Sequence, residues 1–280
     1  MRIGLSLGGG GALGYAHIGA IRAFEEAGIS INVINGSSMG AIVGGAYALY
    51  KDIDHLSAIL SEVTRNINVK SFNIFRYSEE AQPFLRNWAA NAICDISILR
   101  RSILSHKNDL KALKLMFGDR QFSDTKIPFS CAAVDLLTGN IEVIDEGNLA
   151  EGILPSISIP GIFPPVEWEG RLLVDGSVLA DVPVRELREQ GADFVIGIKL
   201  GPKASPGYQT GFDVLNFIEM MKEDTLSRWE IEQADFSIDI NIPDLNIMDF
   251  DSYEGAITRG YEITRQALPK LEMRLAQNHE

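Results

Sequence analysis

The segment Gly36-Ser37-Ser38-Met39-Gly40 has the spacing GxSxG, with Ser38 at its centre. An apolar stretch precedes it and the helical pattern of residues 39–50 follows it, so the serine lies at a turn from a strand to a helix. Such a turn exposes the serine hydroxyl above the sheet, and it needs small neighbours because the backbone is tightly bent. We predict that Ser38 is a nucleophile and that Gly36 and Gly40 form its elbow. The alternative is a serine that only caps the helix.

Four consecutive glycines, Gly8–Gly11, stand between a predicted strand and a predicted helix, and Gly14 follows in the helix. The pattern GxGxxG is present, but a nucleotide site also needs an acidic residue after the next strand or a Gly-Lys-Ser/Thr sequence. Since the sequence has neither, nucleotide binding ranks third among our hypotheses. Backbone N–H groups at the start of a helix stabilise developing negative charge. We predict that the N–H groups of Gly9, Gly10 and Gly11 form an oxyanion hole.

A serine nucleophile needs a base, for which the chain offers histidines and carboxylates. The histidines are His17, His55, His106 and His279. They lack a supporting motif, and the one histidine that follows the late acids stands next to the end of the chain. Asp175 ends a short apolar strand and precedes a glycine turn, which is where open α/β sheets place functional groups. We predict that burial raises the pKa of Asp175 so that it takes the Ser38 proton. Asp181 is the rival candidate for the base. The alternative interpretation of Asp175 is that Asp175-Gly176 only forms a turn.

The spacing of apolar residues predicts the elements that position these groups. A strand, a turn and a helix follow one another twice within the first fifty residues, which implies parallel strands with right-handed crossovers. We predict strands at 2–7, 31–35, 129–134, 141–144, 171–174, 194–199 and 236–240. We predict helices at 12–27, 39–50, 53–66, 109–117, 184–190, 213–233 and 253–274. The loop 201–211 is too short for a domain linker, so we expect residues 1–280 to form one α/β domain, a mostly parallel sheet sandwiched by helices.

The composition excludes several classes of protein. The chain has 280 residues, of which 46% are hydrophobic, so it is not a disordered chain. Its 25 Lys and Arg against 38 Asp and Glu give a net charge of −13, which disfavours nucleic acid and anionic bilayers as partners. Two cysteines, Cys94 and Cys131, form no CxxC motif, and we expect no metal, no cofactor and a reducing, cytoplasmic location. The longest apolar stretch, 41–50, is too short to span a bilayer, so we expect at most peripheral membrane contact.

The three motifs together resemble the patatin-like phospholipase family, over roughly residues 2–200. That family combines a glycine-rich oxyanion loop, a GxSxG elbow and a late Asp-Gly-Gly/Ala, which correspond here to Gly8–Gly11, Gly36–Gly40 and Asp175-Gly176-Ser177. The segment Leu154–Pro165, LPSISIPGIFPP, resembles the family's sequence ahead of the aspartate. The resemblance is greatest to compact bacterial members. It implies a Ser38–Asp175 dyad that hydrolyses a fatty-acyl ester, phospholipid or lysophospholipid through an acyl-serine.

The sequence departs from the family pattern at two positions. Leu13 stands where the family usually has Arg or Lys, and Ser177 stands where Gly or Ala is commoner. We expect little effect from the small Ser177, whereas Leu13 supports an alternative function, a catalytically weak or inactive patatin-fold protein that binds lipid or a regulatory partner. The segment Ser71–Leu104, rich in Phe, Trp and Ile, is either an acyl-binding cover or ordinary core.

Overall fold

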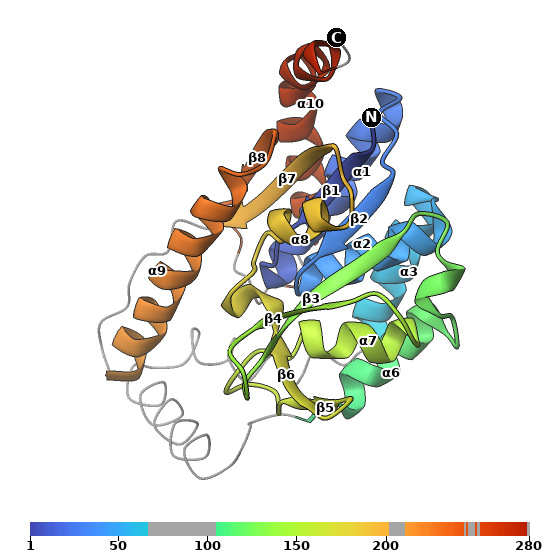
Figure 1. Ribbon diagram of the computed structural model, residues 1–280. Helices are drawn as coiled ribbons and strands as arrows, with labels where there is room; N and C mark the ends of the chain where they lie inside the picture. The colour runs from blue at the N-terminus through green and yellow to red at the C-terminus, as the bar shows by residue number, and fades with distance from the viewer. Residues whose placement is uncertain (67–104, 202–210, 244, 246–249, 251–252, 279–280) are drawn as a thin grey trace.

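The computed structural model describes residues 1–66, 105–201, 211–243, 245, 250 and 253–278 (Figure 1). The segment Ser71–Leu104 therefore lies outside the described residues. Within them the chain forms an eight-stranded sheet in the order β5-β6-β3-β2-β1-β7-β8, with β4 also paired to β3. The strands are β1 (Ile3–Leu7), β2 (Val33–Gly36), β3 (Phe129–Asp135), β4 (Ile141–Ile144), β5 (Val166–Trp168), β6 (Arg171–Asp175), β7 (Phe194–Gly201) and β8 (Phe236–Asn241).

Helices cover both faces of this sheet (Figure 1). The α-helices are α1 (Ala16–Glu26), α2 (Met39–Tyr50), α3 (Ile53–Asn66), α6 (Lys107–Phe117), α7 (Leu149–Ser156), α8 (Val184–Glu189), α9 (Gly211–Ile231) and α10 (Tyr253–Gln277), and the 3-10 turns are η1 (Gly11–Tyr15), η3 (Phe122–Asp124) and η4 (Gly176–Val178). Successive strand residues point to opposite faces. Val33 accordingly packs with Leu187 of α8, whereas Ile34 belongs to the main core.

The strand pairing confirms the predicted α/β fold with a mostly parallel sheet. The pairs β1–β2, β1–β7, β2–β3 and β7–β8 are all parallel. The predicted helix 12–27 begins as the 3-10 turn η1 before it continues as α1, because the glycine loop leads into it with positive φ angles at Gly10 and Gly11.

At one edge of the sheet, β6 pairs antiparallel with β3 and with β5. We had expected Asp175 to end a strand of the parallel part of the sheet, and this expectation is wrong. Strand β3 continues beyond Cys131, the register partner of Gly36 at the end of β2. Strand β6 pairs antiparallel with this extension, and Asp175 lies opposite Ala133. Asp175 is thus not at the carboxyl edge of a parallel strand. Because β6 runs in the reverse direction, its last residue returns to the end of β2, where Ser38 begins the next helix.

The elements predicted from the sequence do not include α7 and β5. Helix α7 begins at Leu149 and contains Pro155 in its last turn. Its N-cap residue is Asn148, whose side chain accepts a hydrogen bond of 3.2 Å from the Glu151 N–H. An internal proline and Gly152 mask the helical pattern, because both residues disfavour helix interiors. The N-cap residue Asn148 was the signal that could have revealed the helix.

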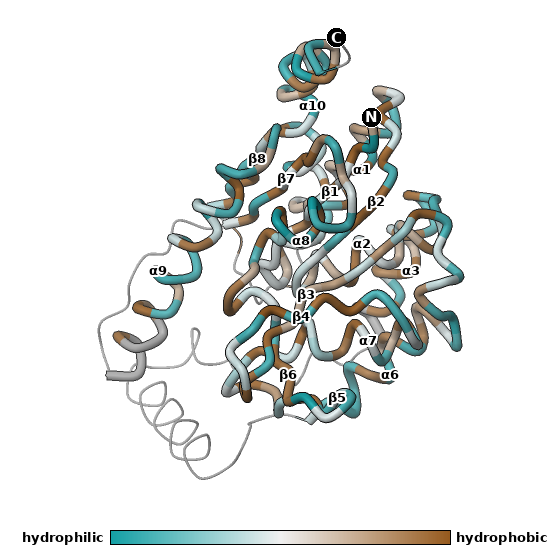
Figure 2. The backbone as a smooth tube through the Cα atoms, in the orientation of Figure 1, coloured by the Kyte–Doolittle hydropathy of each residue, from teal (hydrophilic) through white to brown (hydrophobic). Residues whose placement is uncertain are grey.

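Helix α9 lies between β7 and β8 in the chain and contacts the turn that follows η4. Teal and brown residues alternate along it (Figure 2), and several of its apolar side chains are exposed, among them Ile218, Met221 and Trp229. Its Glu230 side chain accepts a hydrogen bond of 2.9 Å from the Val182 N–H, and Ser227 contacts Asp181. No helix in the described ranges is long and apolar enough to cross a membrane.

Helices α1 and α10 approach each other through glycine. A Cβ atom on Gly19 would overlap the backbone of Ile257 and Tyr261, and one on Gly260 would overlap the backbone of Ala16. The two helices therefore pack backbone against backbone, which is possible only without a side chain at these two positions.

We expect Gly260→Ala to destabilise the protein by about 2 kcal/mol or more, because the methyl group would separate α1 from α10. Gly255→Ala is the matched control in the same helix, since a Cβ there meets nothing within 4 Å. That change should stabilise the protein by about 0.5–1 kcal/mol through helix propensity. Urea unfolding followed by circular dichroism measures both, and equal effects of the two variants would contradict the close packing.

Candidate active site

Ser38 lies at the sharp turn between β2 and α2, with φ 52° and ψ −122°. Non-glycine residues rarely adopt this backbone conformation, which costs about 1–3 kcal/mol. A Cβ on Gly36 would overlap the carbonyl of Gly40, and a Cβ on Gly40 would overlap the carbonyl oxygen of Leu7. Both flanking glycines are therefore required by the geometry of the elbow.

The hydroxyl of Ser38 donates a hydrogen bond of 2.8 Å to Oδ2 of Asp175. The other carboxylate oxygen, Oδ1, accepts from the Ser177 N–H at 2.9 Å and from the Ser177 hydroxyl at 2.8 Å. Asp175 is almost completely buried, and this burial raises its pKa to about 6 despite the hydrogen bonds that favour the ionised form. The carboxylate thus has one oxygen fixed by Ser177 and one directed at the serine.

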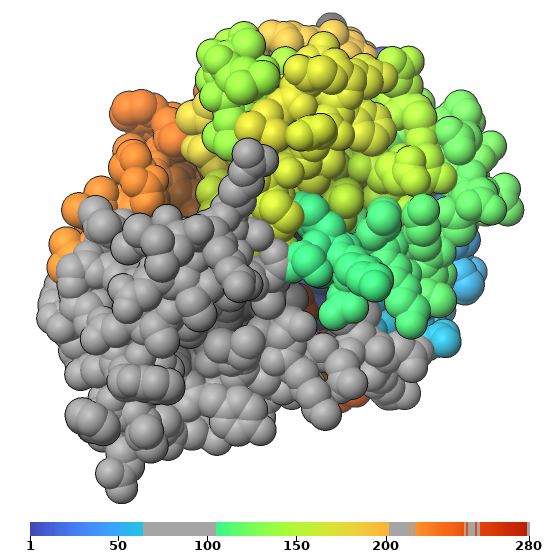
Figure 3. Space-filling view, turned by 90° about the horizontal axis from the view of Figure 1, so that it is seen from below, coloured from blue at the N-terminus to red at the C-terminus, as the bar shows by residue number. Residues whose placement is uncertain are grey.

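The segment Leu154–Pro165 holds both residues by their backbones. The Ser38 N–H donates to the hydroxyl of Ser156 at 3.1 Å, and the Asp175 N–H donates to the carbonyl of Ser158 at 3.0 Å. Seen from below (Figure 3), the start of α6 in green lies against the yellow-green part of the chain that contains this segment. There His106 Nε2 donates to the carbonyl of Pro164 at 2.6 Å. The sequence showed this segment only as a resemblance, and its serines carried no motif of their own.

The glycine loop approaches Ser38 closely, but one predicted donor points elsewhere. A Cβ on Gly9 would lie 3.2 Å from the Ser38 Cβ. The Gly9 N–H, however, donates to Oδ1 of Asp181 at 2.9 Å. The prediction that the Gly9 N–H is a free oxyanion donor therefore needs correction, because a buried carboxylate already accepts this hydrogen. In the part of the chain that the structure describes, no acceptor takes the N–H groups of Gly10 and Gly11.

Comparisons with known proteins show the family to which the chain belongs. The model of the patatin-like phospholipase family matches residues 5–188, a range that includes the glycine loop, the elbow and Asp175. The chain belongs to the patatin-like phospholipase family. An uncharacterised NTE family protein of Mycobacterium tuberculosis is 34% identical over 206 residues, which are 73% of this chain and 51% of that protein. The chain thus spans about half the length of this relative.

Two further matches extend the comparison. A lysophospholipase NTE1 of Scheffersomyces stipitis is 27% identical over 201 residues, which are 71% of this chain and 12% of that protein. The crystal structure of VipD from Legionella pneumophila superposes with a TM-score of 0.54 at 16% identity, covering 96% of this chain and 67% of that one. At such low identity the likeness to VipD concerns the fold, and it confirms the patatin-like α/β architecture.

The two departures from the patatin pattern have different structural consequences. Leu13 is fully buried in the main core, and its N–H closes the glycine turn by donating to the Gly10 carbonyl at 3.1 Å. The loop is therefore anchored by packing where the family usually has a cation. Ser177 is more than a small residue, because its hydroxyl is one of the two donors to Asp175 Oδ1.

The remaining candidate bases lie elsewhere. Asp181, the rival to Asp175, hydrogen-bonds to Gly9 and Ser227. His17 is completely buried, which lowers its pKa to about 4, and its Nε2 lies 2.8 Å from the carbonyl oxygen of Gly8. Because a carbonyl only accepts, the neutral imidazole carries its proton on Nε2 and supports the glycine loop. His279 lies outside the described residues. Among the described residues no group of three His, Cys, Asp or Glu side chains is suited to a metal ion.

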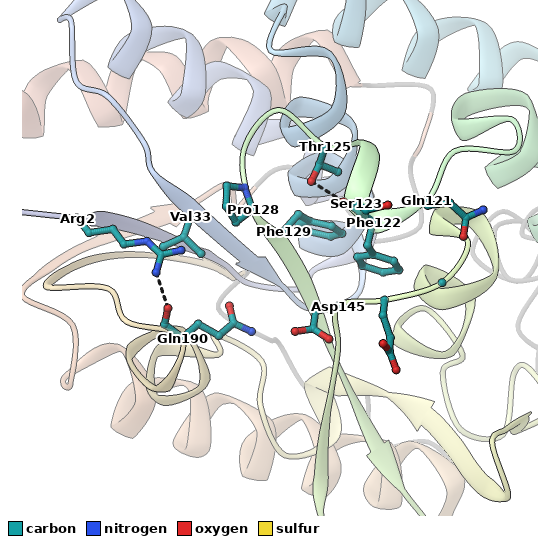
Figure 4. A pocket seen from close by; sticks show the side chains of 12 residues that line it. Arg2, Val33, Gln121, Phe122, Ser123, Thr125, Pro128, Phe129, Asp145 and Gln190 are labelled. Carbon is teal, nitrogen blue, oxygen red and sulfur yellow. Dashed lines mark hydrogen bonds between the residues drawn. The ribbon is translucent and has the colours of Figure 1, made fainter.

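A cavity of about 570 Å³ lies at the opposite edge of the sheet (Figure 4). Val33 and Phe129 in its wall are the first residues of β2 and β3, whereas Ser38 lies beyond Gly36, the last residue of β2. Arg2 and Gln190 lie on the same wall and are joined by a hydrogen bond of 2.7 Å from the Arg2 guanidinium to the Gln190 carbonyl. This cavity is therefore separate from the Ser38 site.

The strain at Ser38 is measurable by comparing two variants that both lack the hydroxyl. Ser38→Gly removes the penalty of the unusual φ, about 1–3 kcal/mol, and adds unfolded-state entropy of about 0.5–1 kcal/mol. We expect Ser38→Gly to be more stable than Ser38→Ala by about 1 kcal/mol in urea unfolding. A Ser38→Gly variant that is no more stable than Ser38→Ala would show that the elbow stores no strain.

Proposed function

We propose that this patatin-like protein is a serine hydrolase of lipid acyl esters that uses a Ser38–Asp175 dyad. The observation that carries the proposal is the hydrogen bond of 2.8 Å from the strained Ser38 hydroxyl to the buried Asp175 carboxylate. A nucleophile held against a base is the arrangement that covalent catalysis requires. The family and the yeast relative named lysophospholipase support a phospholipid or lysophospholipid as substrate.

In the first half of the reaction, ionised Asp175 accepts the Ser38 proton while the serine oxygen bonds to the ester carbonyl carbon. The carbonyl oxygen becomes an oxyanion, which the N–H groups of Gly10 and Gly11 stabilise. The positive end of the α2 dipole, directly after Ser38, adds to this stabilisation. The alcohol then leaves as the C–O bond breaks, and it takes the proton from Asp175. The product of this half is the acyl-serine.

In the second half, Asp175 accepts a proton from water as the water oxygen bonds to the acyl carbon. The bond to Ser38 breaks, Asp175 returns the proton to the serine oxygen, and the free acid departs. The raised pKa of Asp175, about 6, makes it a stronger base than an ordinary aspartate while it stays mainly ionised near neutral pH. The net charge of −13 disfavours anionic bilayers, so the proposed substrates are monomeric, micellar or neutral lipids.

We further propose that residues 1–280 form one domain. The family match ends at residue 188, yet β7 pairs with β1 in the middle of the sheet and β8 continues beyond it. Helix α10 packs on α1 through Gly19 and Gly260. The chain after residue 188 thus completes the core that the matched part begins. Limited proteolysis that leaves residues 1–188 folded would contradict this.

Ser38→Ala and Asp175→Asn should each reduce hydrolysis of p-nitrophenyl butyrate by more than about 1000-fold, because the dyad acts as a unit. Ser37→Ala is the matched control, since the Ser37 hydroxyl is buried and has no partner among the described residues. It should retain the activity of the unmodified protein. A fluorophosphonate probe should label the unmodified protein and not Ser38→Ala. Absence of labelling in the unmodified protein would favour the alternative of a lipid-binding or regulatory protein.

The rate should rise with pH through a midpoint near the Asp175 pKa of about 6, because only the ionised carboxylate accepts the serine proton. Ser177→Gly removes a donor that stabilises the ionised form, so it should raise the pKa of Asp175 and move this limb to higher pH. The profile of kcat/KM against pH measures both. A limb that is unchanged or moves to lower pH in Ser177→Gly would exclude Asp175 as the titrating base.

A further inference from the structure

Asp181 is a second buried carboxylate under the glycine loop, and the proposed chemistry does not use it. It is 4% exposed. Its Oδ1 accepts the Gly9 N–H at 2.9 Å, and its Oδ2 accepts the Ser227 hydroxyl at 2.6 Å. Ser227 belongs to α9, so one carboxylate joins the loop after β1 to a helix that is distant in the sequence. Both of its oxygens are engaged in short, charge-assisted hydrogen bonds.

The peptide unit between Gly8 and Gly9 is held at both ends. Its carbonyl oxygen lies 2.8 Å from Nε2 of His17, and its N–H donates to Asp181. A run of four glycines has great conformational freedom, and without such contacts it would not keep one backbone geometry. His17 and Asp181 therefore fix the plane of this peptide directly before Gly10, whose N–H is one of the proposed oxyanion donors.

The two contacts that His17 and Asp181 make with the Gly8–Gly9 peptide, called the clamp below, also lie next to the nucleophile. A Cβ on Gly9 would be 2.9 Å from Asp181 Oδ1 and 3.2 Å from Ser38 Cβ. The space beside the Gly9 Cα is thus bounded by both side chains, so the Asp181 carboxylate and Ser38 adjoin the same residue of the loop. Oxyanion donors must be preorganised to within fractions of an ångström to stabilise a transition state.

We propose that Asp181 is a positioning residue, which fixes the Gly8–Gly9 peptide so that the N–H groups of Gly10 and Gly11 face the oxyanion. Ser227 holds the second oxygen of Asp181 and so ties the loop to α9. This inference rests on the proposed Ser38–Asp175 function. It assigns the carboxylate a role through the backbone, distinct from that of the base.

The charges around Asp181 allow the positioning role to be separated from an electrostatic one. Burial raises the pKa of Asp181, whereas the hydrogen bonds from Ser227 and Gly9 favour its ionised form. The buried Lys199, which binds Asp224 at 2.8 Å, also favours the ionised form of Asp181. The acids Glu223, Asp224, Glu230 and Asp175 lie near enough to oppose it. The negative charge of Asp181 in turn raises the pKa of Asp175. A neutral replacement of the same shape should therefore keep the clamp and lower the pKa of the base.

The test compares Asp181→Ala with Asp181→Asn on p-nitrophenyl butyrate. Asp181→Ala should lower kcat by about 100-fold, the typical effect of a lost oxyanion donor, with KM changed by less than about threefold. In Asp181→Asn the amide oxygen accepts the Gly9 N–H and the amide nitrogen donates to Ser227. Its kcat should remain within about fivefold of the unmodified protein, and its pH limb should move to lower pH, opposite to Ser177→Gly. Asp193→Ala is the matched control, because Asp193 accepts the Arg2 N–H at the other end of β1 and should leave kcat unchanged.

Hydrogen exchange of the peptide that contains the glycine loop gives a readout independent of turnover. Exchange should be faster in Asp181→Ala than in the unmodified protein and in Asp181→Asn. If Asp181→Ala does not fold, Ser227→Ala carries the test, and it should speed exchange and lower kcat less than about 100-fold. Unmodified kcat in a folded Asp181→Ala, or an equal loss in both Asp181 variants, overturns the inference. If the unmodified protein has no Ser38-dependent activity, the proposed function fails, and unchanged loop exchange in Asp181→Ala would overturn the clamp separately.

Discussion

The backbone of Gly40 lies so close to the carbonyl oxygens of Leu7 and Gly8 that a Cβ atom on Gly40 would overlap both. This contact brings together the two turns that follow β1 and β2. One turn carries Ser38 and the other carries the glycine loop. Because β1 and β2 are parallel neighbours, both turns leave the sheet at the same edge. No side chain at Gly36 or Gly40 would allow this approach. The proposed nucleophile and the proposed oxyanion donors therefore depend on the same tight packing of main chain against main chain.

The acid reaches this edge by a different route. Strand β3 extends past the end of β2, and the antiparallel β6 fills the space beside that extension. Asp175 arrives at the end of β6, and the buried Ser158 carbonyl fixes its N–H. A parallel strand in the same place would carry its last residue away from Ser38. The switch from parallel to antiparallel pairing thus brings Asp175 within hydrogen-bond distance of Ser38.

Several carboxylates around this site are buried or half-buried, although unpaired buried charge is unfavourable. Burial raises the pKa of Asp175 to about 6 and those of Glu223 and Glu230 to about 8. The buried Lys199 lies among them, paired with Asp224. Such an arrangement weakens the fold locally, since each carboxylate disfavours ionisation of the next. It also gives the site a base stronger than an exposed aspartate, which is the usual compromise between stability and activity.

The sequence by itself determined most of the strands and helices, although not α7 and β5, the mostly parallel α/β fold and the three glycine-marked turns. Periodicity and glycine spacing are local properties of the chain, which is why they could be predicted. Ser38 and Asp175 followed from these patterns, and the structure places them in contact. Only the tertiary structure decided that Asp175, and not Asp181, faces the serine, and that Asp181 holds Gly9 instead. It also brought in Ser156, His17 and Ser227, which carry no motif. Contacts between residues that lie far apart in the chain depend on strand direction and packing, and no local pattern specifies these.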